Sequence, residues 1–170
     1  MAYRVRVAAP GDIARIDSLL ARSYPQLLKA DYSPSTLVTA IPLISRAQPR
    51  LISSGTYYVA EEDGEILGAG GWTRDGPMGG HTAGLGHIRH FATEPSALRR
   101  GVARAIMERS LSDATASGLS DLECLSTRTA VPFYQSLGFT TIGNVEIDLR
   151  PGIKFPAIAM VRSLEGRRGH

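Results

Sequence analysis

The feature that most constrains the fold is the change of pattern across residues 91–104, which read FATEPSALRRGVAR. A strand pattern over residues 85–93 is closed by Pro95, a short basic stretch follows, and Gly101 opens a run with apolar residues at helical spacing. A strand that leads into a long helix crosses over to a further strand, and such crossovers place helices on the faces of a sheet. The segment therefore predicts an α/β fold.

The other segments supply a consistent order of strands and helices. Asp12 is expected to cap a first helix, Ser33–Pro34 to open a second, and Asp63–Gly64 to form a hairpin turn. Further helices are predicted at residues 101–117 and 130–137. Strands are predicted over residues 3–8, 56–61, 65–72, 85–93, 121–126, 141–149 and 157–163. A hairpin meander followed by crossover helices predicts a mixed sheet with helices on both faces.

Length and composition exclude several classes of protein. The 170 residues fit one domain, expected over residues 1–165, with residues 166–170 (GRRGH) as a solvated basic tail. The single cysteine excludes an intrachain disulfide, and the four histidines show no metal-ligand spacing, so no metal is expected. A net charge of +3 is too small to indicate nucleic-acid binding. Because no secretory signal and no run of ~18 apolar residues is present, a cytoplasmic protein without a membrane partner is expected.

The start of the helix after Gly101 has the chemistry of an anion-binding site. The first backbone N–H groups of a helix have no partner within it, and the helix dipole adds partial positive charge there. Arg99, Arg100 and Arg104 surround this end, while Gly101 and Ala103 leave room for a phosphate to approach the backbone. The alternative interpretation is an ordinary helix start with a solvated basic rim.

Residues 91–104 resemble motif A of the GCN5-related N-acetyltransferases, the GNAT superfamily, in which a hydrophobic strand and a proline precede R/Q-x-x-G-x-G/A. The matching residues are Pro95, Arg99, Arg100, Gly101 and Ala103. Leu98 departs from the pattern, because the family usually has Arg or Gln there. A second stretch, PFYQSLGF at residues 132–139, resembles the family's later Y-x-x-x-G-F segment. The two stretches follow each other in the family's order, with a strand between them.

The resemblance implies a fold and an activity. The fold is a GNAT-like mixed, mostly antiparallel central sheet flanked by helices, with splayed fourth and fifth strands. The activity is transfer of an acetyl group from acetyl-CoA to a primary amine of a small molecule or peptide, by direct attack on the thioester. Transfer of a longer acyl group is a variant of it, and a noncatalytic CoA-binding regulatory module with the same fold is the alternative. A homodimer that pairs the final strands also fits the resemblance.

The same resemblance implies which residues hold the donor. The pantetheine arm of acetyl-CoA is expected to pair, like an added strand, with Phe91, Ala92 and Thr93. The diphosphate is expected at the helix start, where the implied residues are Arg99, Arg100, Gly101, Val102, Ala103 and Arg104. Thr127 occupies a position at which several relatives have an Asn that touches the cofactor, although a loop or cap role also suits a threonine.

Tyr134 is predicted to act as the acid. It matches the tyrosine that in many relatives donates a proton to the departing thiolate. A phenol with a pKa near ~10 is protonated at neutral pH and can serve as a proton donor. The alternative for Tyr134, which stands beside Phe133, is a core aromatic residue.

The base is predicted to be His87, four residues before Phe91 on the strand that should border the cleft. Arylalkylamine-type relatives carry a histidine at this position, and the ordinary pKa of imidazole suits proton transfer. Strand alternation places His87 on one face with Arg89 and Phe91, and His90 on the opposite face. The other candidates are His90, Glu94 and Glu123. The alternatives are that His87 is a strand residue without a catalytic role, and that a chain of waters, as in many acetyltransferases, takes the place of one direct base.

The acceptor is expected to contact the first two helices and the loops between strands, here residues 24–49 and 74–82. Tyr24, Asp31 and Tyr32 are polar or aromatic enough to contact a small amine. The same residues suit a peptide N-terminus or a lysine, so the sequence leaves the acceptor open.

Overall fold

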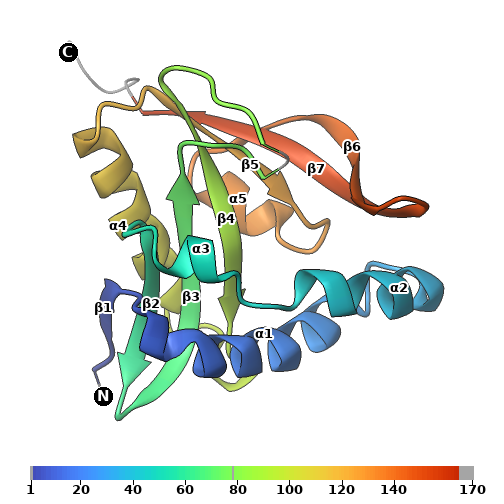
Figure 1. Cartoon of the computed structure of the whole chain (residues 1–170), viewed down its shortest axis with the longest axis horizontal. Coiled ribbons are helices and arrows are strands. Elements are labelled where there is room, and N and C mark those ends of the chain that lie inside the picture. Colours follow the sequence, from blue (N-terminus) through green and yellow to red (C-terminus); the bar gives the residue numbers. More distant parts are fainter. Residues whose placement is uncertain (1, 78, 165–170) are drawn as a thin grey trace.

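The computed structural model describes residues 2–77 and 79–164, so the predicted basic tail at residues 166–170 lies outside the described residues. Seven strands of the described part form one sheet in the order β1-β2-β3-β4-β5-β7-β6 (Figure 1). The strands are β1 (Arg4–Val7), β2 (Tyr57–Glu62), β3 (Glu65–Thr73), β4 (Leu85–Thr93), β5 (Asp121–Ser126), β6 (Thr140–Arg150) and β7 (Ile153–Ser163). Among these strands only β4 and β5 pair in parallel, which confirms the predicted mixed, mostly antiparallel sheet.

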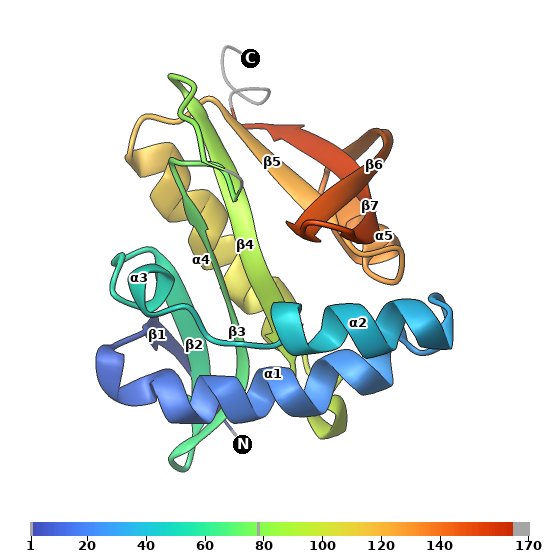
Figure 2. The ribbon, with the colours of Figure 1, turned by 45° about the vertical axis from the view of Figure 1, so that its right-hand side comes forward.

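Helices cover both faces of this sheet (Figures 1 and 2). One face carries α1 (Ile13–Leu28), α2 (Pro34–Ile44) and α3 (Pro49–Ile52), and the other carries α4 (Val102–Ala116) and α5 (Val131–Ser136). Neighbouring residues of β2 belong to the two different cores, as strand alternation requires. Tyr57 packs with Ile16 and Leu20 of α1, whereas Tyr58 packs with Ile106 and Met107 of α4.

A third apolar cluster connects the first two helices to the far end of the sheet. Tyr32 stacks on Phe155 of β7 with ring centroids 4.7 Å apart, and its hydroxyl donates to the Pro156 carbonyl at 2.8 Å. Leu28 and Ala40 complete this cluster. The helical pair α1–α2 therefore contacts the half of the sheet formed by β6 and β7.

The helix starts differ in how well the sequence predicted them. Ser33 caps α2 as expected, because its hydroxyl accepts the Thr36 N–H at 3.2 Å. The prediction that Asp12 caps α1 through its side chain is wrong, since its carboxylate accepts the preceding Ala9 N–H at 2.8 Å instead. Pro42, at which the sequence predicts a bend or an end of this helix, lies inside α2, which continues to Ile44.

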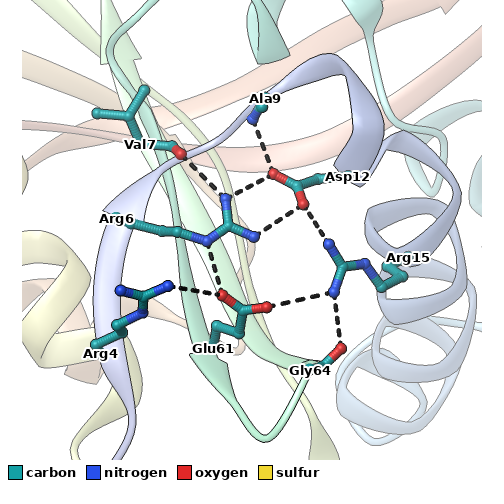
Figure 3. Close-up of polar contacts among 8 residues, drawn as sticks. All are labelled: Arg4, Arg6, Val7, Ala9, Asp12, Arg15, Glu61 and Gly64. Atoms are coloured by element: carbon teal, nitrogen blue, oxygen red, sulfur yellow. Dashed lines mark hydrogen bonds and ion pairs between the residues drawn. The ribbon is translucent and has the colours of Figure 1, made fainter.

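Asp12 belongs to a charged network that joins three segments (Figure 3). The Arg6 guanidinium on β1 donates twice to the Asp12 carboxylate at 2.9 Å and once to Glu61 of β2 at 2.8 Å. Arg15 of α1 donates to Asp12, and to the Gly64 carbonyl of the β2–β3 turn at 2.7 Å. The network holds the first strand, the start of α1 and the first hairpin together.

Candidate active site

The central strands β4 and β5 separate after a short paired stretch. They pair only at Leu85–Asp121, Gly86–Leu122 and His87–Glu123. Figure 2 shows β5 leaning away from β4 beyond this stretch. A cavity of about 760 Å³ occupies the opening, and it is lined by β4 from Ile88 to Thr93 and by residues of α1, α2, β5, α5 and the β6–β7 hairpin. The splayed fourth and fifth strands are therefore confirmed. A second hollow of about 950 Å³ beside the end of α4 contains none of the predicted site residues.

A bulge in β4 changes which side chains face the cavity. His90 has φ +45°, in the left-handed region, and the register with β3 shifts opposite Gly70. The predicted placement of His90 opposite Arg89 is wrong, because both side chains contact Gln48: Arg89 Nη2 donates to Oε1 at 3.3 Å, and His90 Nε2 lies 3.3 Å from Nε2. An alternating pattern across residues 87–91 assumes a regular strand, and the bulge interrupts it.

Phe91 turns to the opposite face of the sheet at the same bulge. Its ring lies 6.5 Å from that of Tyr134 and 6.4 Å from that of Phe133, centroid to centroid. A Cβ atom on Gly70 would come within 2.6 Å of the Phe91 ring, so only glycine leaves room for it. The backbone at residues 91–93, where the pantetheine arm was predicted, forms part of the cavity wall.

His87, the predicted base, is not among the residues that line the cavity. Its ring is buried with Nδ1 3.2 Å from Glu123 Oε1, and it lies against Gly76 in the β3–β4 loop. Glu94 is also engaged elsewhere, because its carboxylate pairs with Arg22 at 2.6 Å. Of the four candidate bases, only His90 lines the cavity.

The environment of His90 keeps its imidazole neutral. Burial and the adjacent Arg89 charge both disfavour the imidazolium and lower the pKa of His90 to about 4. The Tyr57 hydroxyl donates to the His90 carbonyl at 2.9 Å, which helps to hold the bulge. A neutral imidazole at the cavity wall can accept a hydrogen bond from an incoming amine.

The predicted anion site has the expected backbone shape. A turn of 3-10 helix, η2 (Pro95–Ala97), leads to Arg99 at φ +75° and Gly101 at φ +77°, directly before α4. Ala105 N–H is bonded to the Gly101 carbonyl at 2.9 Å, so the N–H groups of residues 102–104 precede the first bond of this kind. Arg99 is exposed, and Arg104 donates to Ser136 Oγ of α5 at 3.3 Å.

Arg100 has a structural contact that the sequence did not indicate. Its guanidinium donates twice to the Glu62 carboxylate, at 2.8 and 3.1 Å, and lies over the Tyr3 ring. The Tyr3 hydroxyl donates to the Arg100 carbonyl at 3.3 Å. In the described structure this arginine fastens the turn to the first strands of the sheet.

Tyr134 is packed among aromatic rings and also lines the cavity, so its position suits both a core residue and a proton donor. Its ring contacts the rings of Phe91, Phe133 and Phe139 edge-on, and burial raises the pKa of its hydroxyl well above the ordinary value. Its hydroxyl has no hydrogen-bond partner among the described residues, and the residue lines the cavity. The phenol is therefore protonated and available to a ligand.

Two further cavity residues have simpler roles. Burial raises the pKa of the Cys124 thiol to about 12, so it is protonated and is no nucleophile at neutral pH. Thr127 lines the cavity, and its hydroxyl accepts the Ala130 N–H at 3.2 Å at the start of α5. Thr127 thus holds the turn before α5, which is the loop role weighed for it, and Ala130 is the N-cap of the helix.

Comparisons with known proteins agree with this geometry. The family model described as acetyltransferase (GNAT) domain matches residues 28–160. A GCN5-related N-acetyltransferase (aminotransferase, class-II) from Rhodopseudomonas palustris is 18% identical, with 96% of each chain covered and a TM-score of 0.75. PaiA N-acetyltransferase from Thermoplasma acidophilum, solved with coenzyme A, is 13% identical, with 96% of this chain and 99% of that chain covered and a TM-score of 0.71.

A third similar structure is N-acetylglutamate synthase from Neisseria gonorrhoeae, solved with coenzyme A and N-acetyl-glutamate. It is 22% identical, with 96% of this chain and 35% of that chain covered and a TM-score of 0.64. At these identities the solved structures establish the fold. No curated protein sequence matches the chain.

Two kinds of feature are absent from the described residues. None of the helices at residues 2–77 and 79–164 is long and apolar enough to cross a membrane. Within the same ranges, no three or more His, Cys, Asp or Glu side chains gather as a metal site would require.

Proposed function

The chain belongs to the GNAT acetyltransferase family, and from this premise we propose that it transfers an acetyl group from acetyl-CoA to a primary amine of a small molecule or peptide. The observation that carries the proposal is the open edge of β4 beyond His87, which faces the cavity without a β5 partner among the described residues. An extended, amide-containing arm can bond to such an edge as an added strand would. The pantetheine arm of acetyl-CoA has this chemistry.

The proposed donor site extends from this edge to the start of α4. The N–H groups at residues 101–104 would hold the diphosphate, with support from the exposed Arg99 and Arg104 side chains. Arg100 would contribute its backbone, since its side chain is bonded to Glu62. The thioester would then lie near Phe91, beside Tyr134.

The proposed reaction is a direct attack of the neutral amine on the thioester carbonyl carbon. The attack forms the new C–N bond and gives a tetrahedral intermediate with a negatively charged oxygen. A backbone N–H of β4 would stabilise this oxyanion. Collapse of this intermediate breaks the C–S bond, and Tyr134 would donate its phenolic proton to the departing sulfur. The base that takes the proton of the amine would return it to Tyr134 through the cavity solvent.

Two imidazoles are candidates for the group that takes the proton of the amine, and the geometry supports His90. His90 lines the cavity, whereas His87 pairs with Glu123 outside the lining. His87 would serve the site by supporting the β3–β4 loop at Gly76. With rates expressed per unprotonated amine, the pH–rate profiles of His90→Gln and His87→Gln distinguish the two. The variant that lacks the true proton acceptor loses the acidic limb of this corrected profile, and the other variant keeps it.

The proposed function is tested by incubating the protein with acetyl-CoA and a panel of amines and measuring the release of free thiol. Tyr134→Phe should lower kcat about 100-fold, because general acid catalysis contributes about this much, and should leave the Kd for acetyl-CoA unchanged. Tyr58→Phe is the matched control, because it also removes a phenol hydroxyl. The Tyr58 hydroxyl lies on the α4 face of the sheet, where it donates to Asp113.

Three results would decide against parts of the proposal. Full activity of Tyr134→Phe would reject the acid role. Tight acetyl-CoA binding without thiol release from any amine would favour the noncatalytic CoA-binding module. No binding of acetyl-CoA at all would reject the donor site.

A further inference from the structure

The geometry points to a carboxylate-binding subsite at Arg89, which would make the acceptor an amine that also carries a carboxylate group and an apolar body. An amino acid with a large apolar side chain has this chemistry. The inference deepens the proposed function and rests on it, because it names the class of acceptor that the same cavity would take.

Arg89 is a half-buried cation without an acidic partner among the described residues. Arg89 lines the cavity, and its guanidinium lies within ion-pair distance of no carboxylate in that part of the chain. The only acidic residue in the described lining, Asp148, is paired with Lys154 at 2.8 Å. Removing a charge from water without a partner is unfavourable, and burial accordingly lowers the pKa of Arg89. A bound anion would supply the missing partner.

Neutral groups hold the Arg89 side chain in place. Nη1 donates to Thr73 Oγ1 at 3.0 Å and Nη2 donates to Gln48 Oε1 at 3.3 Å. A guanidinium has five N–H donors in a planar fork, so these two bonds orient it and leave donors for a ligand. The fork matches the two oxygens of a carboxylate, and such charge-assisted pairs are the stronger hydrogen bonds in proteins.

Charge balance favours a carboxylate over a phosphate ester. One guanidinium neutralises one negative charge, and His90, the only other base in the described lining, is neutral. A phosphate ester at neutral pH carries nearly two negative charges and would leave the second one uncompensated in a partly apolar cavity. A carboxylate leaves no excess charge.

The rest of the lining indicates an apolar body. Two helices and the last hairpin contribute large apolar side chains, namely Leu27, Leu28, Leu43, Ile44, Ile147, Leu149 and Phe155. Arg89 lies two residues before Phe91 on β4, and both residues line the same cavity. An amine held by its carboxylate at Arg89 would therefore lie in the same cavity as the thioester proposed beside Phe91.

The subsite would also act on His90. The Arg89 charge is one of the two causes that lower the pKa of His90, and a carboxylate bound to Arg89 would offset it. The imidazole would then become a better proton acceptor only while the acceptor is bound. The bulge makes this possible, because it brings both side chains to the same face.

Matched acceptors test the subsite. L-Leucine, L-leucinamide and 3-methylbutylamine share a side chain, and only leucine carries the carboxylate. With acetyl-CoA saturating, and with rates compared per unprotonated amine, kcat/KM for leucine should exceed the other two at least tenfold. Arg89→Gln should remove this preference by raising KM for leucine about tenfold, and Arg89→Lys should retain part of it. Arg109→Gln, which removes a positive charge on α4 paired with Asp113, should keep the preference.

A binding measurement separates this inference from the proposed function. With CoA present, N-acetyl-L-leucine should bind at least tenfold more tightly than N-(3-methylbutyl)acetamide by calorimetry, and Arg89→Gln should abolish the difference while retaining the melting temperature. Equal binding of both compounds and equal use of the matched acceptors by the unaltered protein would overturn the carboxylate subsite and leave acetyl transfer standing. Arg89-dependent binding without thiol release from any amine would support the subsite and contradict the proposed reaction.

Discussion

Asp12 shows how one buried carboxylate can hold several segments together. Only 3% of the residue is exposed, and its oxygens accept hydrogen bonds from Arg6, Arg15 and the Ala9 N–H. A buried charge of this kind is stable only while its partners remain, because its desolvation is offset by the charged hydrogen bonds.

Replacing Asp12 with Asn should lower the free energy of unfolding by about 2 kcal/mol, since two guanidinium groups lose their shared anion. Urea unfolding followed by circular dichroism measures this loss. Asp148→Asn is the control, because the exposed Asp148–Lys154 pair should contribute less than about 0.5 kcal/mol. Equal losses in the two variants would contradict the special role of Asp12.

The same carboxylate makes stability depend on pH in the acid range. The Arg6 guanidinium is the main cause that lowers the pKa of Asp12, from 3.8 to about 2. Because the folded state binds this proton less readily than the unfolded state, the stabilisation is complete above about pH 4 and is lost as the pH falls toward 2. It should amount to roughly 2 kcal/mol. Unfolding measured between pH 5 and 2 should show a shallower decline in Asp12→Asn, and parallel curves would rule out this origin.

At the scale of elements, the turn before α4 combines two requirements in one residue. Gly101 has φ +77°, which disfavours any other residue, and it precedes the free N–H groups of the helix. Gly118 follows the other end of the same helix and has φ +89°. A Cβ atom at this position would meet no atom within 4 Å. The two positions share the backbone strain and differ in their distance from the proposed diphosphate site.

Gly101→Val should therefore raise the Kd for acetyl-CoA at least tenfold, because a branched side chain would displace the backbone that is proposed to hold the diphosphate. Gly118→Val should carry a similar cost in stability, about 1 kcal/mol, and keep the affinity. Calorimetric titration with acetyl-CoA and thermal unfolding measure both effects. An unchanged Kd in Gly101→Val would argue against diphosphate binding at this turn.

Most elements were predictable because their patterns are local. The hairpin at Asp63–Gly64, the cap at Ser33 and the helix after Gly101 all follow from residues close in sequence. The four-residue α3 was not predicted, since so short a helix has no periodicity to detect. The misplaced cap depends on the folded structure around it, because the Asp12 carboxylate is bonded to Arg6 of β1 and to the Ala9 N–H.

The candidate site was predictable where its residues lie close together in the sequence. The turn at Gly101 and the tyrosine at residue 134 belong to continuous stretches that the sequence shows directly. The grouping of Arg89, His90 and Gln48 was not predictable, because it results from a bulge in β4 opposite Gly70 and from a loop far away in the sequence. The engagement of Arg100 with Glu62 likewise joins residues 38 positions apart.

At the scale of the whole molecule, the sheet consists of two parts joined by a three-residue ladder. One part comprises β1 to β4, anchored at its outer end by the Asp12 network, and the other comprises β5, β7 and β6. Besides this ladder, the Tyr32–Phe155 stack connects α1–α2 to the second part. The cavity lies between these two connections, so its width depends on how both parts are held.

The short β4–β5 ladder has a consequence for the exchange of amide hydrogens with solvent. A strand in the middle of a sheet ordinarily protects its amides on both edges, and exchange then requires extensive opening. The β4 amides at residues 88–93 that face the opening should instead exchange rapidly in the free protein, while those at residues 85–87 stay protected. Saturating acetyl-CoA should slow the first group selectively, as measured by deuterium uptake with mass spectrometry. Uniform uptake along β4, unaffected by the donor, would show that this edge does not take part in binding.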